Sequence, residues 1–451
     1  MIYERKFGYH LTQISIAQNK NKTLSRGSEM QVPKIVNELE TKIINTLKLS
    51  RFKNQIVGRG YVTGLKAVTY FLNIPKPTVF MSRGASLKLC ETVSQFGLNK
   101  ILIVTDAGLY KLGLLDPIIE QLKASSMAYS IFAEVQPDPT FDVVEGGLKQ
   151  YRSDNCDSVL AVGGGSSIDA AKVIALAASN NVEPKQLVGI LKGKKPSVPF
   201  FAIPTTAGTG SEATIGAVIS DSVTHKKELV IDTKIVPLVA ALDPDLMKGL
   251  PAAITAVTGM DALTHLIESY LSGMANEESD YYARSGIQMV FENLPVAYKR
   301  GNVIKAREKM ALASYYGGLT INIAGLGYVH AFAHQLGAKY GIPHGEANAK
   351  LLPYILEFNK IASAGRMAEI SRFLGLSKEG ESDKHQAEKL IHAVKGLIAE
   401  LKISPTIPQI KKEDYASIIQ HAFKEANSTY AVAKYMSYDE AVYILDCIAR
   451  K

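Results

Sequence analysis

The sequence predicts two domains, an α/β domain built on a parallel sheet and, after it, an all-helical domain. The first observation is an alternation of short apolar runs and helical patterns between residues 76 and 245. The second is the helical pattern after Asp243-Pro244, where no clear strand run follows until the end of the chain. A chain of 451 residues is also too long for one compact core. We therefore expect a leader at 1–75, an α/β domain at 76–245 and a helical domain at 246–451.

Three segments of the first domain have the pattern of buried strands. They are KILIVTDAGL at 100–109, DSVLAVGGG at 157–165 and PFFAIPTTAGTG at 199–210. A helical pattern, IDAAKVIALAAS at 168–179, lies between the second and the third. Helices of this kind connect parallel strands, and ligands of such sheets bind at the carboxyl ends of the strands. The residues that follow the three strands are therefore candidate ligand-binding residues.

The segment GGGSSIDAAK, from Gly163 to Lys172, places glycines between a strand and a helix. Glycines let the backbone approach a phosphate, and the start of the helix offers free N–H groups and a positive dipole end. The segment differs from the G-x-G-x-x-G fingerprint, and a tight turn is the alternative explanation. The candidate cofactor-binding residues here are Gly163, Gly164, Gly165, Ser166 and Asp169.

Two other loops carry polar residues after strands. Thr205, Thr206 and Thr209 have hydroxyls that could bond a phosphate or a ribose, with a local hydroxyl-stabilised turn as the alternative. Asp106 follows the strand KILIVT. A carboxylate there can accept hydrogen bonds from the adenine-ribose hydroxyls and repel a 2′-phosphate, which favours NAD over NADP. The alternative is an aspartate that only forms the turn.

The helical domain contains histidines at helical spacing. In GMDALTHLIESY (259–270), Asp261 and His265 are four residues apart, so they share one helix face. In GYVHAFAHQLGAKYGIPHGEAN (327–348), His330 and His334 have the same spacing, and we expect His344 in a loop after Pro343. A carboxylate and imidazoles suit a borderline divalent ion such as Fe²⁺, Zn²⁺, Co²⁺ or Ni²⁺. The absence of thiolates argues against a zinc-finger type of site.

Charge and composition exclude several classes of protein. Residues 1–75 hold 12 Lys and Arg against 4 Asp and Glu, which accounts for the whole net charge of +8, so the remaining body is neutral. A neutral body lacks the electrostatic footprint of a nucleic-acid enzyme. No apolar run reaches the ~18 residues that span a bilayer, and no signal peptide opens the chain. Three cysteines without CxxC spacing fit a reducing compartment. We expect a cytoplasmic protein without nucleic-acid or transmembrane character.

The leader is basic, and its role stays open between a poorly ordered tail, a transit peptide and a contact with a partner or a membrane surface. Residues 35–48 (IVNELETKIINTLK) predict a short amphipathic helix within it.

Together, five strings resemble the iron-containing (group III) alcohol dehydrogenases: GGGSSIDAAK, PTTAGTGSE, DPDL, GMDALTHLIESY and GYVHAFAHQLGAKYGIPHGEAN. The resemblance runs from about Phe71 to the C-terminus, and the pattern is similar to that of lactaldehyde (propanediol) reductases and bacterial ethanol dehydrogenases. It implies an NAD-linked alcohol dehydrogenase or aldehyde reductase with its active site between the two domains. It also implies one divalent metal, Fe²⁺ first and Zn²⁺ as the alternative, and a homodimer or larger homo-oligomer.

The motif match carries the family's functional residues onto this chain. The metal ligands fall on Asp261, His265, His330 and His344. The family's non-ligand histidine near the nicotinamide falls on His334, our candidate for proton relay or substrate orientation. The family's pyrophosphate loop falls on Gly163, Gly164, Gly165 and Ser166, and its threonine loop falls on Thr205, Thr206 and Thr209. Its NAD-selecting acidic residue falls on Asp106. A lysine that touches the cofactor falls on Lys227, although Lys226 is adjacent. The frequent P-N-P-T turn reads PDPT, which puts Asp138 near the cofactor where many members carry Asn.

The expected reaction is reversible hydride transfer between the nicotinamide and a small alcohol or aldehyde, whose oxygen the metal polarises. The spacing of the three histidines at 330–344 disfavours a relative of the glycerol dehydrogenase or dehydroquinate synthase type. A hydroxyacid–oxoacid transhydrogenase stays open as a second enzymatic function. A catalytically idle metal- or nucleotide-binding paralogue stays open as a function without catalysis.

Overall fold

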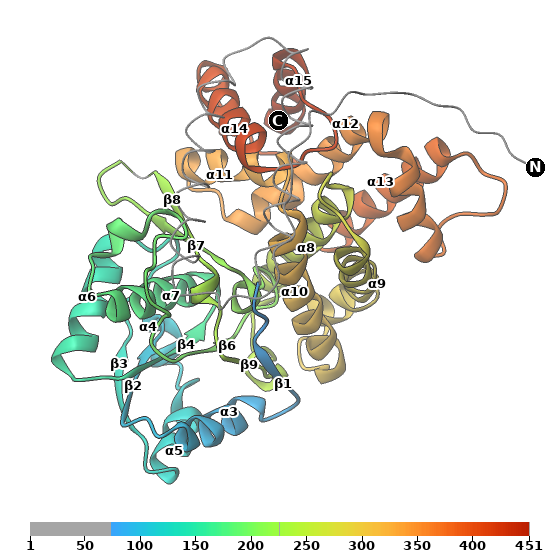
Figure 1. Cartoon of the computed structure of the whole chain (residues 1–451). Helices are drawn as coiled ribbons and strands as arrows, with labels where there is room; N and C mark the ends of the chain where they lie inside the picture. The colour runs from blue at the N-terminus through green and yellow to red at the C-terminus, as the bar shows by residue number, and fades with distance from the viewer. Residues whose placement is uncertain (1–73, 225, 451) are drawn as a thin grey trace, which may run out of the picture.

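The computed structural model describes residues 74–224 and 226–450 (Figure 1). A sheet-containing part comes first in the chain, coloured blue to green, and a helical part follows, coloured yellow to red. The leader and the helix predicted at 35–48 lie outside the described residues, so their predictions stay untested.

The first part is built on a six-stranded parallel sheet with the order β1-β9-β6-β4-β2-β3. Its strands are β1 (Thr78–Met81), β2 (Lys100–Val104), β3 (Ala128–Phe132), β4 (Ser158–Gly163), β6 (Phe200–Pro204) and β9 (Val239–Leu242). From β2 the chain passes to β3 on one side and then to β4 on the other. The carboxyl ends of β2 and β4 therefore lie at a switch point of the topology, where open parallel sheets bind ligands.

Helices cover both faces of this sheet. Ile101 and Ile103 of β2 pack in one core with α3 (Ala85–Val93) and α5 (Asp116–Ala124). Leu102 and Val104 pack in another core with α6 (Phe141–Ser153) and α7 (Gly165–Asn180). Successive strand residues point to opposite faces, so a strand covered on both sides is apolar throughout. The predicted parallel α/β fold with flanking helices is confirmed.

A smaller three-stranded sheet, which the sequence did not predict, lies beside the main one. Its order is β5-β8-β7, with β5 (Gly189–Ile190), β7 (Gly216–Ser220) and β8 (Lys227–Ile231). The short helix η3 (Ser211–Ala213) lies in the chain between β6 and β7, and another short helix, α4 (Ala107–Lys111), follows β2. The small sheet matters for the site because Lys227 opens β8.

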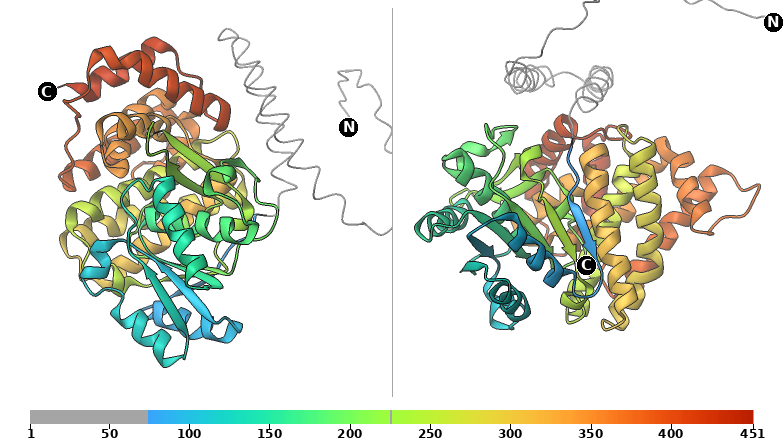
Figure 2. Two further views of the ribbon diagram at one scale, coloured as in Figure 1. Left: turned by 90° about the vertical axis from the view of Figure 1, so that its left-hand side faces the viewer. Right: turned by 60° about the horizontal axis from the view of Figure 1, so that its bottom comes forward.

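The second part is helical throughout its described residues, as predicted. Its helices are α8 (Ala252–Leu271), α9 (Glu277–Lys299), α10 (Ile304–Ala324), α11 (Tyr328–Tyr340), α12 (His344–Phe373), α13 (Asp383–Glu400), α14 (Tyr415–Thr429) and α15 (Tyr438–Ala449). Figure 2 shows α9 and α10 side by side next to the sheet. One large apolar core fills the space between these helices and reaches Ala207, Ala213 and Leu242 of the first part.

The two parts meet without a spacer at Gly210 and Gly318. Gly210 has a φ of 60°. A Cβ on Gly318 of α10 would lie 2.3 Å from the carbonyl oxygen of Gly210. The backbone N–H of Gly210 also donates to the Ser314 hydroxyl (3.1 Å). Only glycine allows two backbones to approach so closely, so the loop after β6 rests directly on the helical part.

Two observations bear on the class of protein. No helix among the described residues is long and apolar enough to cross a membrane. The three cysteines are free and buried.

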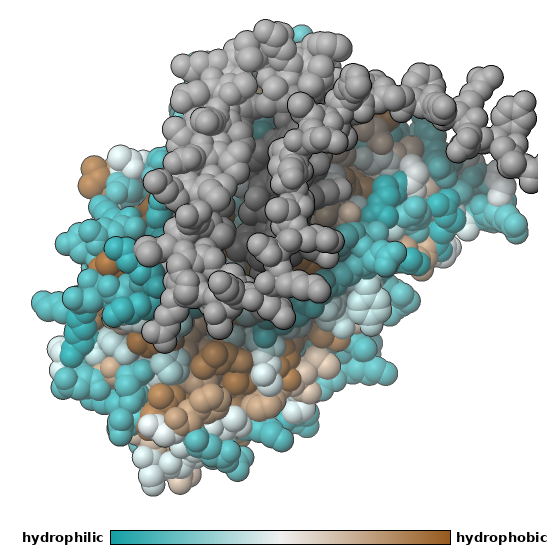
Figure 3. All heavy atoms as spheres, viewed as in Figure 1, coloured by the Kyte–Doolittle hydropathy of each residue, from teal (hydrophilic) through white to brown (hydrophobic). Residues whose placement is uncertain are grey.

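On the face drawn in Figure 3, apolar side chains gather in the lower part of the molecule, where Figure 1 shows β1.

Candidate active site

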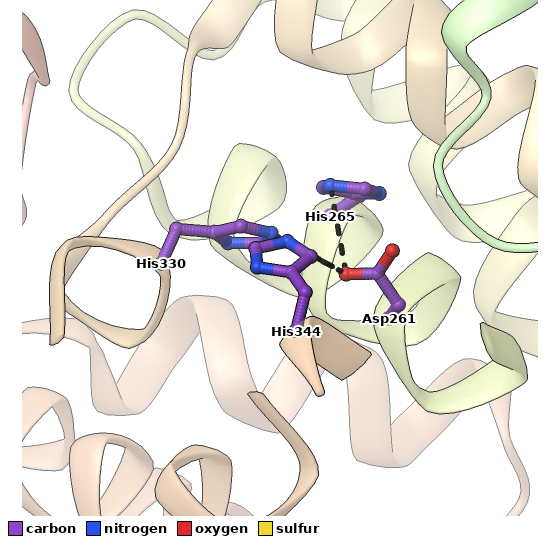
Figure 4. Close-up of side chains that lie close together, drawn as sticks. All are labelled: Asp261, His265, His330 and His344. Atoms are coloured by element: carbon purple, nitrogen blue, oxygen red, sulfur yellow. Dashed lines mark ion pairs between the residues drawn. The ribbon is translucent and has the colours of Figure 1, made fainter. Parts of the chain in front are cut away.

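Four side chains of the helical part point toward one another (Figure 4). Asp261 and His265 come from successive turns of α8, His330 from α11 and His344 from the start of α12. Each offers one ligand atom, and these four atoms all lie within 4.8 Å of one another. The structure thus brings together all four residues on which the predicted metal ligands fall.

His344 does not lie in a loop as expected but is the first residue of α12, with Pro343 as its N-cap. Proline has no backbone N–H to donate. Just before a helix this loses no hydrogen bond, because an N–H at that position would have no partner within the helix. A Cβ on the next residue, Gly345, would lie 2.2 Å from the Val257 carbonyl oxygen of α8. Glycine therefore lets the start of α12 press against α8 and delivers His344 to the cluster.

The separations within the cluster fit a set of metal ligands. Asp261 Oδ1 lies 3.4 Å from His344 Nε2, 3.6 Å from His330 Nε2 and 3.9 Å from His265 Nε2. In a tetrahedral site with bonds of ~2.1 Å, ligand atoms are about 3.4 Å apart. One carboxylate oxygen and three imidazole nitrogens also form a donor set that Fe²⁺ and Zn²⁺ both accept.

Burial and mutual contacts set the protonation of this cluster. The histidines hold the pKa of Asp261 far below its usual range, although burial alone would raise it. Burial lowers the pKa of His265 to about 4 and that of His344 well below its usual value, so both rings are neutral at pH 7. Burial also opposes the charge on His330, but hydrogen bonds to Asp261 and Glu268 outweigh it and raise the pKa to about 9. An ion bound at His330 would have to displace that proton.

Glu268 supports His330 from behind, and the sequence prediction missed it. Its carboxylate accepts from Nδ1 of His330 (2.7 Å) and from the backbone N–H groups of Val329 (2.7 Å) and Gly327 (2.9 Å). A carboxylate on Nδ1 fixes the tautomer and turns Nε2 toward the cluster, an arrangement typical of metal-binding histidines. The signal was available, since Glu268 lies seven residues after Asp261, on the same face of α8.

His334 lies beside the cluster but is not one of its four members. Its ring stacks on the His344 ring, with centroids 5.1 Å apart and an angle of 13° between the planes. Its Nδ1 lies 2.6 Å from Glu425 of α14, and the Tyr430 hydroxyl donates to the same carboxylate oxygen (2.7 Å). The Nδ1 side of the His334 ring is therefore taken by Glu425. Glu425 is 91 residues from His334, and no sequence pattern linked them.

The glycine loop and the threonine loop are in contact at the carboxyl ends of β4 and β6. A Cβ on Gly165 would lie 2.6 Å from Thr209, and one on Gly164 would lie 3.4 Å from Thr206. The N-cap of α7 is Gly164, which has no side chain to bond the first N–H groups of the helix. Free N–H groups at a helix start form an anion site, so this cradle fits a pyrophosphate.

Asp106 lies at the same edge of the sheet, directly after β2. It is the N-cap of α4 and accepts from the backbone N–H of Leu109 (2.9 Å). The structure therefore shows the turn-forming role, which leaves its second carboxylate oxygen for a ligand.

Asp169 is placed differently from the other predicted cofactor residues. One carboxylate oxygen accepts from the Ser211 hydroxyl (2.5 Å) and the other from the backbone N–H of Val218 (2.9 Å). The Lys172 ammonium, itself bonded to Ser211, lies 3.8 Å away. Asp169 thus ties α7 to η3 and β7, and both of its oxygens are taken by the protein.

Lys227 and Asp138 form an ion pair at 2.7 Å. The Lys227 ammonium also lies close to α11, 3.9 Å from where a Cβ of Gly337 would be, so it reaches the helical part. Lys226 instead pairs with Glu228 on the surface, which separates the two adjacent lysines. Asp138 has φ of 54°, a conformation that Asp and Asn tolerate better than other residues with a side chain.

A parallel sheet that carries an anion cradle, next to a helical part with one carboxylate and three imidazoles, is the arrangement expected of a metal-dependent enzyme with a nucleotide cofactor. The sequence model described as "Iron-containing alcohol dehydrogenase" matches residues 76–244. The model described as "Fe-containing alcohol dehydrogenase family, C-terminal" matches residues 255–447. The chain belongs to the iron-containing alcohol dehydrogenase family.

Individual relatives agree with this assignment. The chain is 40% identical over 357 residues to alcohol dehydrogenase 4 of Schizosaccharomyces pombe, which covers 78% of this chain and 83% of that protein. It is 39% identical over 351 residues to the NAD-dependent methanol dehydrogenase of Bacillus methanolicus, with 77% and 92% covered. The crystal structure of a 1,3-propanediol oxidoreductase is similar with a TM-score of 0.81 at 37% identity, covering 83% of this chain and 99% of that one. The protein is an NAD-dependent alcohol dehydrogenase, as the sequence predicted.

Proposed function

We propose that the protein interconverts small primary alcohols and short aldehydes with NAD(H), using one divalent ion held by Asp261, His265, His330 and His344. The convergence of these four ligand atoms within 4.8 Å is the observation that carries the proposal. The names of similar proteins contain methanol and 1,3-propanediol, which supports a small alcohol as the substrate class.

The two bound groups supply the reactive chemistry: the ion acts as a Lewis acid toward the alcohol or aldehyde oxygen, and the nicotinamide carries the hydride. The protein's own residues hold these groups in place. The neutral rings of His265 and His344 and the ionised Asp261 are already in the states that bind a cation. Fe²⁺ is our first expectation because of the family, with Zn²⁺ as the alternative for the same donor set.

On the cofactor side, the N–H groups at the start of α7, with Gly163, Gly164, Gly165 and Ser166, would hold the pyrophosphate. Thr205, Thr206 and Thr209 would add hydroxyl contacts, and Asp106 would bond the adenine ribose and reject a 2′-phosphate. Lys227 would reach the cofactor from β8, with Asp138 as its partner.

His334 is proposed to take or return the alcohol proton, or to orient the substrate. Glu425 holds its Nδ1, so the Nε2 atom acts. His334→Ala should lower kcat by about 10²–10⁴-fold, while the metal content stays near one ion per chain. His265→Ala is the matched control because it should lose the metal as well. Loss of metal in His334→Ala would mean that His334 is itself a ligand.

The function is tested with protein that has been stripped of metal and then reconstituted anaerobically with Fe²⁺ or Zn²⁺. NADH oxidation is followed against a panel of short aldehydes. We expect activity to return with one of the ions and to be absent in His265→Ala. If no aldehyde is reduced with either ion, the proposal fails, and an oxoacid acceptor in the same assay tests the transhydrogenase.

We further propose a homodimer or larger homo-oligomer in the cytoplasm, with domains at 76–245 and 246–451 after the leader. β1 is an edge strand of the main sheet. Met81 at its end is 45% exposed, and Leu238, which lies beside Thr78 at its start, is 49% exposed. An apolar sheet edge of this kind favours pairing with a second chain. Light scattering of the purified protein tests the oligomeric state.

A further inference from the structure

Asn348 lies at the centre of the metal cluster, although it is not among the predicted ligands. It follows His344 by four residues on α12, so both project from the same helix face. Its side chain is fully buried. The amide nitrogen Nδ2 lies 2.7 Å from Asp261 Oδ1, 3.1 Å from His330 Nε2 and 3.2 Å from His344 Nε2. One amide group thus contacts the ligand atoms of three of the four cluster residues.

The other end of this amide has no partner among the described residues. Asn348 Oδ1 is buried and accepts no hydrogen bond from them. A buried acceptor without a partner destabilises the folded protein. The contacts at Nδ2 must therefore outweigh this loss to hold the side chain in its orientation. An amide NH₂ group has two hydrogens and acts only as a donor. Its short contact with Asp261 is therefore a donated hydrogen bond to the carboxylate oxygen that faces all three histidines.

The three contacts differ in whether they can persist beside a cation. A carboxylate oxygen has enough lone pairs to accept an N–H and to bind an ion as well, whereas a neutral imidazole nitrogen has one. The hydrogen bond from Asn348 to Asp261 is thus compatible with a bound ion, whereas the close approach of the same amide to the two ring nitrogens is not.

We propose that Asn348 is a positioning residue of the metal centre. Its N–H holds the Asp261 carboxylate so that Oδ1 faces the three histidines. This inference rests on the proposed metal site. Without the amide, the Asp261 carboxylate is free to turn and to offer both oxygens, so both the affinity for the ion and its coordination change.

The first test is Asn348→Leu, which keeps roughly the shape of the side chain and removes the donor. Dissociation constants for Zn²⁺ and Co²⁺ are measured by chelator competition, and the visible absorption of the Co²⁺ form reports the coordination. We expect affinity to fall about 10–100-fold, the usual effect of losing a group that orients a ligand, and the Co²⁺ spectrum to change. NADH binding and circular dichroism establish that the variant is folded.

Asn293→Leu is the matched control. Asn293 lies on α9, where its amide bonds to the Met289 carbonyl in its own helix (2.9 Å), outside the cluster. This variant should keep the wild-type affinities and spectrum. Wild-type affinities and an unchanged Co²⁺ spectrum in Asn348→Leu would overturn the inference. Failure of the wild-type protein to bind any divalent ion would instead overturn the proposed function.

Asn348→Asp distinguishes the role of the amide N–H from that of the amide oxygen. It also provides a test if the leucine variant does not fold. An ionised aspartate has nearly the same size but cannot donate, so its Co²⁺ spectrum should differ from wild type, as that of the leucine variant does. If Asn348→Asp has the wild-type spectrum and affinity, the N–H donor is not required, and the proposed contact is refuted.

Discussion

Substitution of Gly165 by alanine probes the contact between the two loops that are proposed to hold the cofactor. A Cβ at this position would lie 2.6 Å from Cγ2 and 2.9 Å from Oγ1 of Thr209. Carbon atoms in good contact are ~3.5–4.0 Å apart, so the loops would have to separate by about 1 Å. Overpacking of this size costs typically ~1–3 kcal/mol. If the loops must be in contact to bind the cofactor, affinity for NADH falls about 5–150-fold.

The assay is a fluorescence titration of Gly165→Ala with NADH, accompanied by metal analysis. Metal content should stay at the wild-type level because the cluster lies in the helical part. Gly396→Ala is the matched control, since Gly396 is inside α13 and nothing lies within 4 Å of its added Cβ. That change should leave NADH binding intact and stabilise the protein by ~0.5–1 kcal/mol, because alanine is the better helix former.

A second substitution tests the cause of the loss. Thr209→Ser removes Cγ2, the atom nearest to the added Cβ, and leaves Oγ1. Gly165→Ala combined with Thr209→Ser should therefore recover part of the NADH affinity. Wild-type affinity in Gly165→Ala alone would show that the two loops do not form the cofactor cradle. A loss that Thr209→Ser fails to relieve would show that this contact is not its cause.

Three more predictions concern single carboxylates. Glu268→Gln keeps the shape but cannot accept from His330 and two backbone N–H groups at once, so chelator competition should show metal affinity about 10–100-fold weaker; unchanged affinity would contradict the supporting role. Asp106→Ser keeps a cap for α4 and removes the charge, so the ratio of kcat/KM for NADPH over NADH should rise at least ~10-fold, and a constant ratio would mean that Asp106 does not select the cofactor. Burial raises the pKa of Glu212 to about 7 from 4.5. The folded protein therefore binds this proton more tightly than the unfolded chain, and stability falls as pH rises from about 4.5 to 7. Glu212→Gln should accordingly raise the free energy of unfolding by about 3 kcal/mol at pH 8 and have little effect at pH 4.5; urea unfolding at both pH values measures this, and an equal effect at both would refute the cause.

The sequence predicted the central strands of the sheet but not its margins. β2, β4 and β6 are buried on both faces, so they appear as continuous apolar runs. β1 and β3 lie at the edges and are partly exposed, and β9 has only four residues. Short or half-exposed strands lack a pattern that distinguishes them from loops. β5, β7 and β8 were missed for the same reason.

The sequence by itself determined the candidates for the site, because the relevant signals are local. A spacing of four residues places Asp261 and His265 on one helix face, and glycines before a helix indicate an anion cradle. Only the tertiary structure decided how these candidates are used. His334 lies beside the cluster and contacts Glu425. Lys227, rather than Lys226, forms the ion pair with Asp138. The Asp169 carboxylate accepts hydrogen bonds from other residues of the protein. The tertiary structure also placed Glu268 and Asn348 around the ligands. A local pattern can place Glu268 on the same face of α8 as Asp261. Contacts between helices far apart in the chain depend on how those helices pack together, and a local pattern contains no information on that packing.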